Sequence, residues 1–162
     1  MSERLGTVTV VDGVATMTFV RRLPHPIKAV WAALTEPAQR AAWLGETVFS
    51  DDRIEMIPND PPAAPEAKKL TGRILVWDPP HVLEHEWRQR IVEDGVVRYE
   101  LREDGEGTIL TFTHTGLSER NARGFAPGTH AFFDRMAAFL DGVALPGWQD
   151  RYNELAPSYP AW

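Results

Sequence analysis

The residues with the widest chemical range in this sequence are its five histidines, because the 162-residue chain contains no cysteine. That absence excludes thiolate nucleophiles, disulfides and cysteine metal ligands. His25 lies between two prolines and His81 follows two more, so both are expected at the surface. His130 falls near the start of a predicted helix and is expected to make a hydrogen bond. His85 and His114 lie in strand-like runs, where alternation can turn both side chains inward.

Successive residues of each central strand point alternately to the two faces of the predicted sheet. The apolar face carries Leu83, His85, Trp87, Tyr99, Leu101, Leu110, Phe112 and His114. The other face of the first two strands carries Glu84, Glu86, Arg88, Arg98, Glu100 and Arg102. Charges on neighbouring strands are typical of a solvated face with cross-strand ion pairs. Burial of the apolar face therefore places His85, Tyr99 and His114 in the interior.

Pairing these strands across their turns predicts which side chains meet. With "EDG" (residues 93–95) as the turn between the first two strands, His85 is expected near Glu103. Across the next turn, Tyr99 is expected opposite Phe112, and Val97 opposite His114. At about 3.3 Å per residue, His85 and His114 would then lie near opposite ends of the sheet. The sequence thus predicts no metal ion shared between them.

Motifs for other chemistries are absent or incomplete. "HEW" (residues 85–87) imitates the start of an H-E-x-x-H zinc motif, but Gln89 takes the place of the second histidine and the segment is strand-like. There is no G-x-S-x-G elbow, and no G-x-G-x-x-G or Walker loop. The adjacent acidic residues at 51–52 and 103–104 suit turns. We therefore predict no catalytic residue, no metal site and no cofactor.

Charge and hydropathy exclude two classes of partner. The net charge is −6, and lysine and arginine form no stripe, so a nucleic-acid partner is not expected. No run approaches the roughly 20 apolar residues that span a bilayer. The first ten residues carry no signal-peptide pattern, so a cytoplasmic location is expected.

The elements that must position these residues follow from turn and helix signals. Asp12-Gly13 predicts a first hairpin. Apolar residues at helical spacing predict helices over 27–34 and 37–45, separated at Pro37. Further strands are expected within 47–57 and over 70–77, 82–91, 96–103 and 108–115, and the proline-rich segment 58–69 is predicted to be a loop. The last third is helical: Pro127-Gly128 should interrupt or start its main helix, and Gly142 should end it. The order predicts an α+β fold with an antiparallel sheet covered by this helix.

Four segments in order resemble the START-like (SRPBCC) superfamily, and within it the proteins similar to the activator of heat-shock-protein-90 ATPase. They are "LPHPIKAVWAALTEPAQRAAWLG", "WDPPHVLEHEW", "GTILTFTHTGL" and "GTHAFFDRMAAFLDG". The resemblance covers residues 6–142. It implies a helix-grip fold, in which a curved antiparallel sheet wraps the long C-terminal helix. The first segment would then be two small helices that plug one end of the sheet, with Trp31, Leu34 and Trp43 in the core. Thr129 departs from the family, where a tryptophan is common.

The resemblance also implies a cavity between the sheet and the long helix, often used for apolar ligands. The ligand-binding residues expected here are Trp87, Tyr99, Leu101, Leu110, Phe112, His114, Phe133, Met136 and Leu140. Tyr99 and His114 would be the polar groups that orient a small apolar molecule. Two alternatives stay open: a cyclase-like or hydrolase-like enzyme with His114 as base and Tyr99 as proton donor, and a chaperone-associated interaction domain.

The domain organisation is predicted as one START-like domain over residues 1–145, followed by a short helix and aromatic tail over 146–162. The tail contains Trp148, Tyr152, Leu155, Tyr159 and Trp162. Exposed apolar surface of this kind often marks an interface. The tail is therefore expected to pack on its own domain or on a second copy in a homodimer.

Overall fold

Short polar turns divide the chain into hairpins. In this computed structural model, which describes residues 5–159, the strands are β1 (Thr7–Val11), β2 (Val14–Leu23), β3 (Gly45–Ser50), β4 (Arg53–Pro58), β5 (Leu70–Asp78), β6 (Val82–Gln89), β7 (Gly95–Asp104) and β8 (Gly107–Leu117). Asp12 and Gly13 join β1 to β2 with φ values of 51° and 79°. Glycine reaches positive φ at little cost and aspartate tolerates it, so this hairpin forms as predicted.

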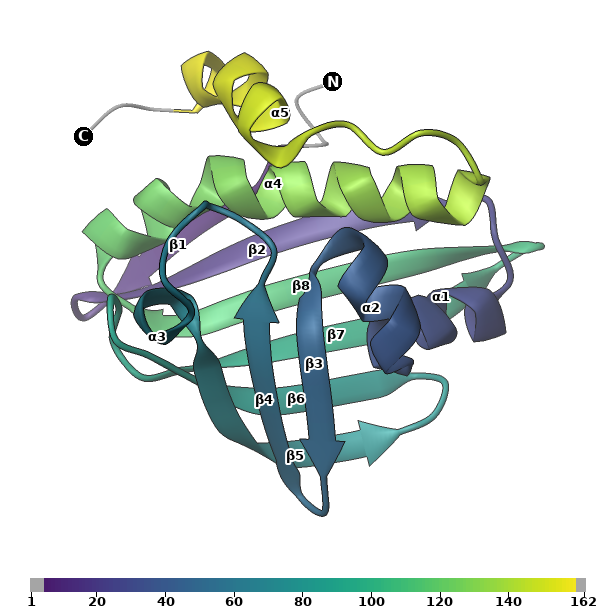
Figure 1. The fold of residues 1–162 in the computed structure, drawn as a ribbon, viewed down its shortest axis with the longest axis horizontal. Helices are drawn as coiled ribbons and strands as arrows, with labels where there is room; N and C mark the ends of the chain where they lie inside the picture. The colour runs from purple at the N-terminus through teal and green to yellow at the C-terminus, as the bar shows by residue number, and fades with distance from the viewer. Residues whose placement is uncertain (1–4, 160–162) are drawn as a thin grey trace.

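The strands within residues 5–159 make one antiparallel sheet in the order β1-β2-β8-β7-β6-β5-β4-β3. The non-sequential pairing of β2 with β8 brings the N-terminal hairpin beside the last strand. The sheet curves, and the long helix α4 (Glu119–Asp141) lies across its concave side (Figure 1). The predicted α+β helix-grip fold is confirmed.

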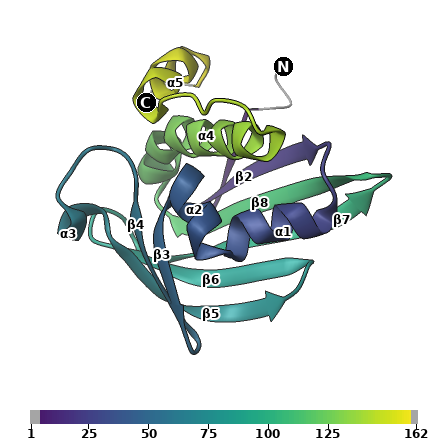
Figure 2. The same cartoon turned by 45° about the vertical axis from the view of Figure 1, so that its right-hand side comes forward.

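Two short helices, α1 (Ile27–Thr35) and α2 (Pro37–Trp43), fill one end of the space between sheet and α4 (Figure 2). Leu34 and Trp43 are buried, and the Trp43 indole donates a 2.9 Å hydrogen bond to the Ala33 carbonyl. Trp31 was expected in the core but is only half-buried. Its ring packs against the edge of the core and also contacts the exposed Trp77 of β5, at a centroid distance of 5.7 Å.

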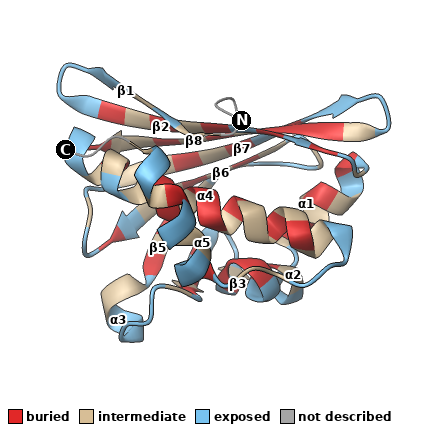
Figure 3. Cartoon of the chain, turned by 90° about the horizontal axis from the view of Figure 1, so that it is seen from above, coloured by how far each residue is buried: buried red, intermediate tan, exposed pale blue. Residues whose placement is uncertain are grey.

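The helix α4 runs through Pro127 without a break, which corrects the predicted interruption or restart there. Ser118 caps its first turn by accepting a 3.1 Å hydrogen bond from the Asn121 amide, and Gly142 ends it at φ 70°. Proline removes one helical hydrogen bond. Burial of Ala126, Pro127 and Gly128 outweighs that loss. Figure 3 shows buried residues recurring along α4 and α1.

Three short helical segments remain among residues 5–159. A short helix α3 (Pro65–Lys68) interrupts the proline-rich segment. The helix α5 (Trp148–Leu155) and the single turn η2 (Ala156–Ser158) follow α4. In Figure 1, α5 crosses the outer side of α4, away from the sheet. Trp148 and Leu155 pack there against Ala131 of α4. Trp162, part of the predicted aromatic tail, lies outside the described residues.

Candidate functional site

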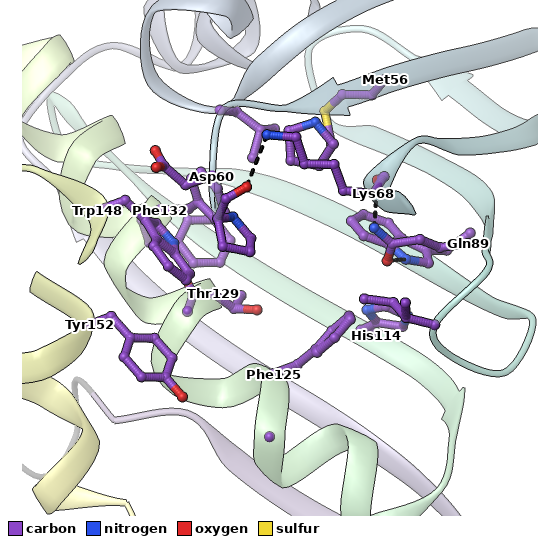
Figure 4. Close-up of a pocket in the computed structure, with 18 of the residues that line it drawn as sticks. Met56, Asp60, Lys68, Gln89, His114, Phe125, Thr129, Phe132, Trp148 and Tyr152 are labelled. Carbon is purple, nitrogen blue, oxygen red and sulfur yellow. Dashed lines mark hydrogen bonds between the residues drawn. The ribbon is translucent and has the colours of Figure 1, made fainter. Parts of the chain in front are cut away.

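A pocket of about 440 Å³ lies between the sheet and the N-terminal half of α4 (Figure 4). The sheet contributes its apolar face, since alternation turns Trp87, Tyr99, Phe112 and His114 to the same side. The helix α4 contributes Gly124, Phe125, Gly128, Thr129, Phe132 and Phe133. The site is therefore a mostly aromatic cavity with few polar groups.

Two segments complete its rim. The first is the proline-rich loop, which contributes Pro58, Asp60, Pro61, Ala63, Ala67 and Lys68. The second is α5, which contributes Trp148, Gln149 and Tyr152. The first was predicted as a loop and the second as a short helix with an aromatic tail, and both form walls of the pocket. Neither segment has a sequence pattern that predicts a pocket wall.

Hydrogen bonds hold the loop against β6. Gln89 donates a 2.6 Å bond to the Lys68 carbonyl, and the Trp87 indole donates a 3.0 Å bond to the Gln89 side-chain oxygen. The Lys68 ammonium turns back to the Pro61 carbonyl at 3.0 Å. The polar groups of Trp87, Gln89 and Lys68 are thus used within the protein to shape the rim.

Trp148 fixes α5 on α4 at a single close approach. Its indole donates a 3.0 Å hydrogen bond to the Gly128 carbonyl. A Cβ at position 128 would lie 2.9 Å from the Trp148 ring. Gly128 therefore makes room for Trp148, and together they set the wall at this edge.

The predicted ligand-binding residues divide between this pocket and the solid core. Five of them line the pocket: Trp87, Tyr99, Phe112, His114 and Phe133. Leu101, Leu110 and Met136 are buried in the core, and Leu140 packs half-buried against it. These four lie toward the end that α1 fills by contacting β7, β8 and α4. The plug helix occupies the space that the sequence assigned to a ligand.

The predicted separation of His85 and His114 is wrong. Val97 pairs with His85 on one side and with His114 on the other. The chain turns at residues 90–92, and residues 93–94 lead into β7. The turn predicted at 93–95 shifted the register, whereas the pairings of Tyr99 with Phe112 and Val97 with His114 are confirmed. His85 and His114 thus lie at the same level of the sheet, two strands apart, with Trp87 between their rings at centroid distances of 6.4 and 5.0 Å.

Both of these histidines are buried and uncharged. Burial lowers the pKa of His85 to about 4 and that of His114 to about 3. His85 donates from Nδ1 to its neighbour's carbonyl, the Glu86 oxygen, at 2.8 Å. The Nε2 atoms of both rings are buried without a hydrogen-bond partner among the described residues. Only His114 lines the pocket.

The other histidines have structural surroundings. His81 is exposed in its turn, as expected. His25 was expected to be exposed but is half-buried, because its ring meets the Asp141 carboxylate at 2.7 Å. His130 is buried in α4 and its Nδ1 lies 2.7 Å from the Tyr159 hydroxyl. Within residues 5–159, no group of three or more histidine or acidic side chains is placed to hold a metal ion.

A buried arginine that the sequence did not indicate lies beside the site. Arg40 of α2 donates to the Thr47 hydroxyl at 2.9 Å and to the Leu34 carbonyl at 2.7 Å. Its third nitrogen lies 3.1 Å from the Met56 sulfur. Burial lowers the pKa of Arg40 and raises the pKa of Tyr99, and the positive charge of Arg40 offsets part of that rise in Tyr99.

Comparison with known families now adds to this geometry. Residues 24–141 match the family model of the "Activator of Hsp90 ATPase homolog 1-like protein". The chain belongs to this family. The match runs from the plug helices through α4, and the pocket wall formed by α5 lies outside it. Family membership confirms the START-like relationship predicted from the four sequence segments.

Solved structures share the fold of this family member. CalU16 from Micromonospora echinospora has a TM-score of 0.73 at 21% identity, over 96% of this chain and 94% of that one. The BPP1335 protein from Bordetella parapertussis has a TM-score of 0.74 at 27% identity, over 94% and 87%. MLL2253 from Mesorhizobium loti has a TM-score of 0.69 at 24% identity, over 80% and 99%. A comparison with curated proteins finds no significant match.

One departure from the family pattern falls in the pocket. Thr129, where the resemblance drawn from the sequence implies a tryptophan, is on the wall formed by α4. A threonine leaves open the volume that an indole would fill. Separately, none of the helices in the described residues has the length and apolar composition to cross a membrane.

Proposed function

We propose that the protein binds a small apolar molecule in the pocket between its sheet and α4. The observation that carries the proposal is a cavity of about 440 Å³ walled by aromatic side chains. Ligand sites are typically apolar concavities with a few polar groups that fix orientation. Tyr99 and His114 line this pocket and would take that role.

The size of the pocket suits a molecule of more than one ring. An apolar cavity of roughly 150 Å³ binds benzene. The present cavity of about 440 Å³ is close to three times larger. Membership in a START-like family also supports ligand binding, because domains of this type generally bind ligands.

The enzyme alternative is less well supported. A general base works best when its pKa lies near the operating pH. The pKa of His114 is lowered to about 3, so the neutral ring is a weak proton acceptor at neutral pH. The chaperone-associated alternative is not specifically favoured by any contact described for residues 5–159. The cytoplasmic location and the homodimer stay predictions from the sequence.

The substitution Thr129→Trp tests the binding function. An indole at this position would fill the pocket from the α4 wall. We expect the affinity for a neutral fluorescent probe, N-phenyl-1-naphthylamine, to fall at least about tenfold, or about 1.4 kcal/mol. Arg120→Trp is the matched control, because Arg120 is exposed on the same helix outside the pocket. Equal affinity of both variants, or no binding by the parent, would overturn the proposal.

A further inference from the structure

Two polar side chains in the pocket retain unused hydrogen-bonding capacity. Neither ring nitrogen of His114 is bonded to a described residue, and its Nε2 is buried. His114 as a whole is 1% exposed. The Tyr99 hydroxyl likewise makes no hydrogen bond to a described residue. By contrast, Trp87 and Gln89 satisfy one another and the loop.

A buried polar atom without a partner costs stability, and such groups are normally satisfied in proteins. His85 Nε2 is also without a partner among the described residues, but only His114 lines the pocket, so only at His114 can a molecule bound in the pocket supply the partner. Neutral imidazole has one accepting nitrogen and one N–H. A ligand that carries a hydroxyl group can donate to the accepting nitrogen.

The inner part of the pocket carries no charge to receive an ion. Burial keeps His114 neutral, with a pKa of about 3, and raises the pKa of Tyr99. The cation of Arg40 does not line the pocket, because its nitrogens face Thr47, Leu34 and Met56. Transfer of a charged ligand into this site would cost its hydration without a counter-charge.

Aromatic rings surround His114. The Trp87 and Phe125 rings lie with their centroids 5.0 and 6.2 Å from the His114 ring. Phe112 and Phe133 meet edge to face at 5.2 Å in the adjoining wall. Figure 4 shows the Phe125 side chain of α4 pointing toward the neighbouring His114 ring of β8. Ring walls of this kind favour an aromatic ligand, which gains edge and face contacts beyond area burial.

We propose that the pocket selects an uncharged aromatic molecule of two or three rings whose hydroxyl group donates a hydrogen bond to His114. This inference rests on the proposed binding function and goes beyond it by assigning the chemical class of the ligand. The hydroxyl would satisfy the accepting nitrogen of His114, while the rings occupy the aromatic walls.

Three matched probes test it: naphthalene, 2-naphthol and 2-naphthoate, each measured at pH 7 by displacement of N-phenyl-1-naphthylamine. We expect 2-naphthol to bind about tenfold more tightly than naphthalene, as a hydrogen bond to a desolvated partner predicts. The anionic 2-naphthoate should bind more weakly than naphthalene. In His114→Phe, the advantage of 2-naphthol over naphthalene should disappear while naphthalene still binds. His81→Phe, in an exposed turn, is the control and should keep the advantage.

A measurement on the parent protein keeps the test independent of variant folding. The ¹⁵N chemical shifts of the His114 ring should move when 2-naphthol is added and stay in place with naphthalene. Equal affinities of 2-naphthol and naphthalene, tighter binding of 2-naphthoate, or unmoved His114 shifts would overturn the ligand class and leave the binding function standing. Failure of all three probes and of the fluorescent probe would overturn the binding function itself.

Discussion

At the scale of single residues, the paired burial of His85 and His114 makes stability depend on pH. Their pKa values of about 4 and about 3 lie below the ordinary value of 6.5, so the unfolded chain binds protons that the folded chain does not. Their stabilising effect is complete above pH 6.5 and is lost as the pH falls from there toward the folded values. The free energy of unfolding should fall by up to about 1.4 kcal/mol per pH unit for each histidine.

Urea denaturation between pH 7.5 and 5 measures this loss, because carboxylates remain largely ionised in that range. His114→Phe should reduce the slope and His81→Ala should leave it unchanged. The cation of Arg40 contributes to the lowered pKa of His85. A slope that is the same in the parent and His114→Phe would contradict the assignment of His114 as a buried neutral group.

At the scale of elements, α5 is expected to stabilise the domain and to close the pocket edge. Deletion of the residues after Leu145 removes Trp148, which is 9% exposed and packs against Ala131 and Phe132. We expect a lower melting temperature, since truncating a buried tryptophan alone typically costs about 3–5 kcal/mol. Differential scanning calorimetry on the deletion and on Trp148→Ala checks this. Asn153→Ala, on the exposed side of α5, is the control.

Sedimentation of the same deletion separates the two predicted uses of the tail. If α5 serves its own domain, the deletion changes stability without dissociating an assembly. Loss of a dimer would instead assign the apolar residues of the tail to a second copy. Unchanged stability together with unchanged oligomeric state would show that the tail contributes to neither.

At the scale of the whole molecule, the pocket divides the interior into an open and a filled half. Phe133 borders the open half and is 3% exposed, whereas Leu34 lies in the filled half and is fully buried. Phe133→Ala should cost near the lower end of about 3–5 kcal/mol and should bind a larger probe, pyrene, more tightly than the parent. Leu34→Ala should cost about 2–5 kcal/mol with no gain in binding. Urea denaturation and pyrene fluorescence measure both, and a full core cost at Phe133 without tighter binding would mean that this region is solidly packed.

The sequence by itself determined the elements and their faces. Asp-Gly and other turn residues have local dihedral preferences, so they marked most hairpins, and alternation correctly turned Tyr99 and His114 inward. Gly142 marked the C-terminal end of α4, but the proline signal at Pro127 was outweighed by burial of the surrounding helix. Four sequence segments, following one another in the order expected for the family, were enough to indicate it.

Only the tertiary structure decided which faces enclose space. Whether His85 lies beside His114 depended on the position of the β6–β7 turn. A shift of that turn changes every residue pairing between the two strands. The proline-rich loop and α5 became pocket walls through contacts with Gln89 and Gly128, residues distant in sequence from Lys68 and Trp148. Leu101 and Met136 share the inward face with Tyr99 and Phe133, yet they pack in the solid core toward the end that the plug helix fills. Local patterns fix which way a side chain points, whereas the cavity depends on how distant elements divide the volume between them.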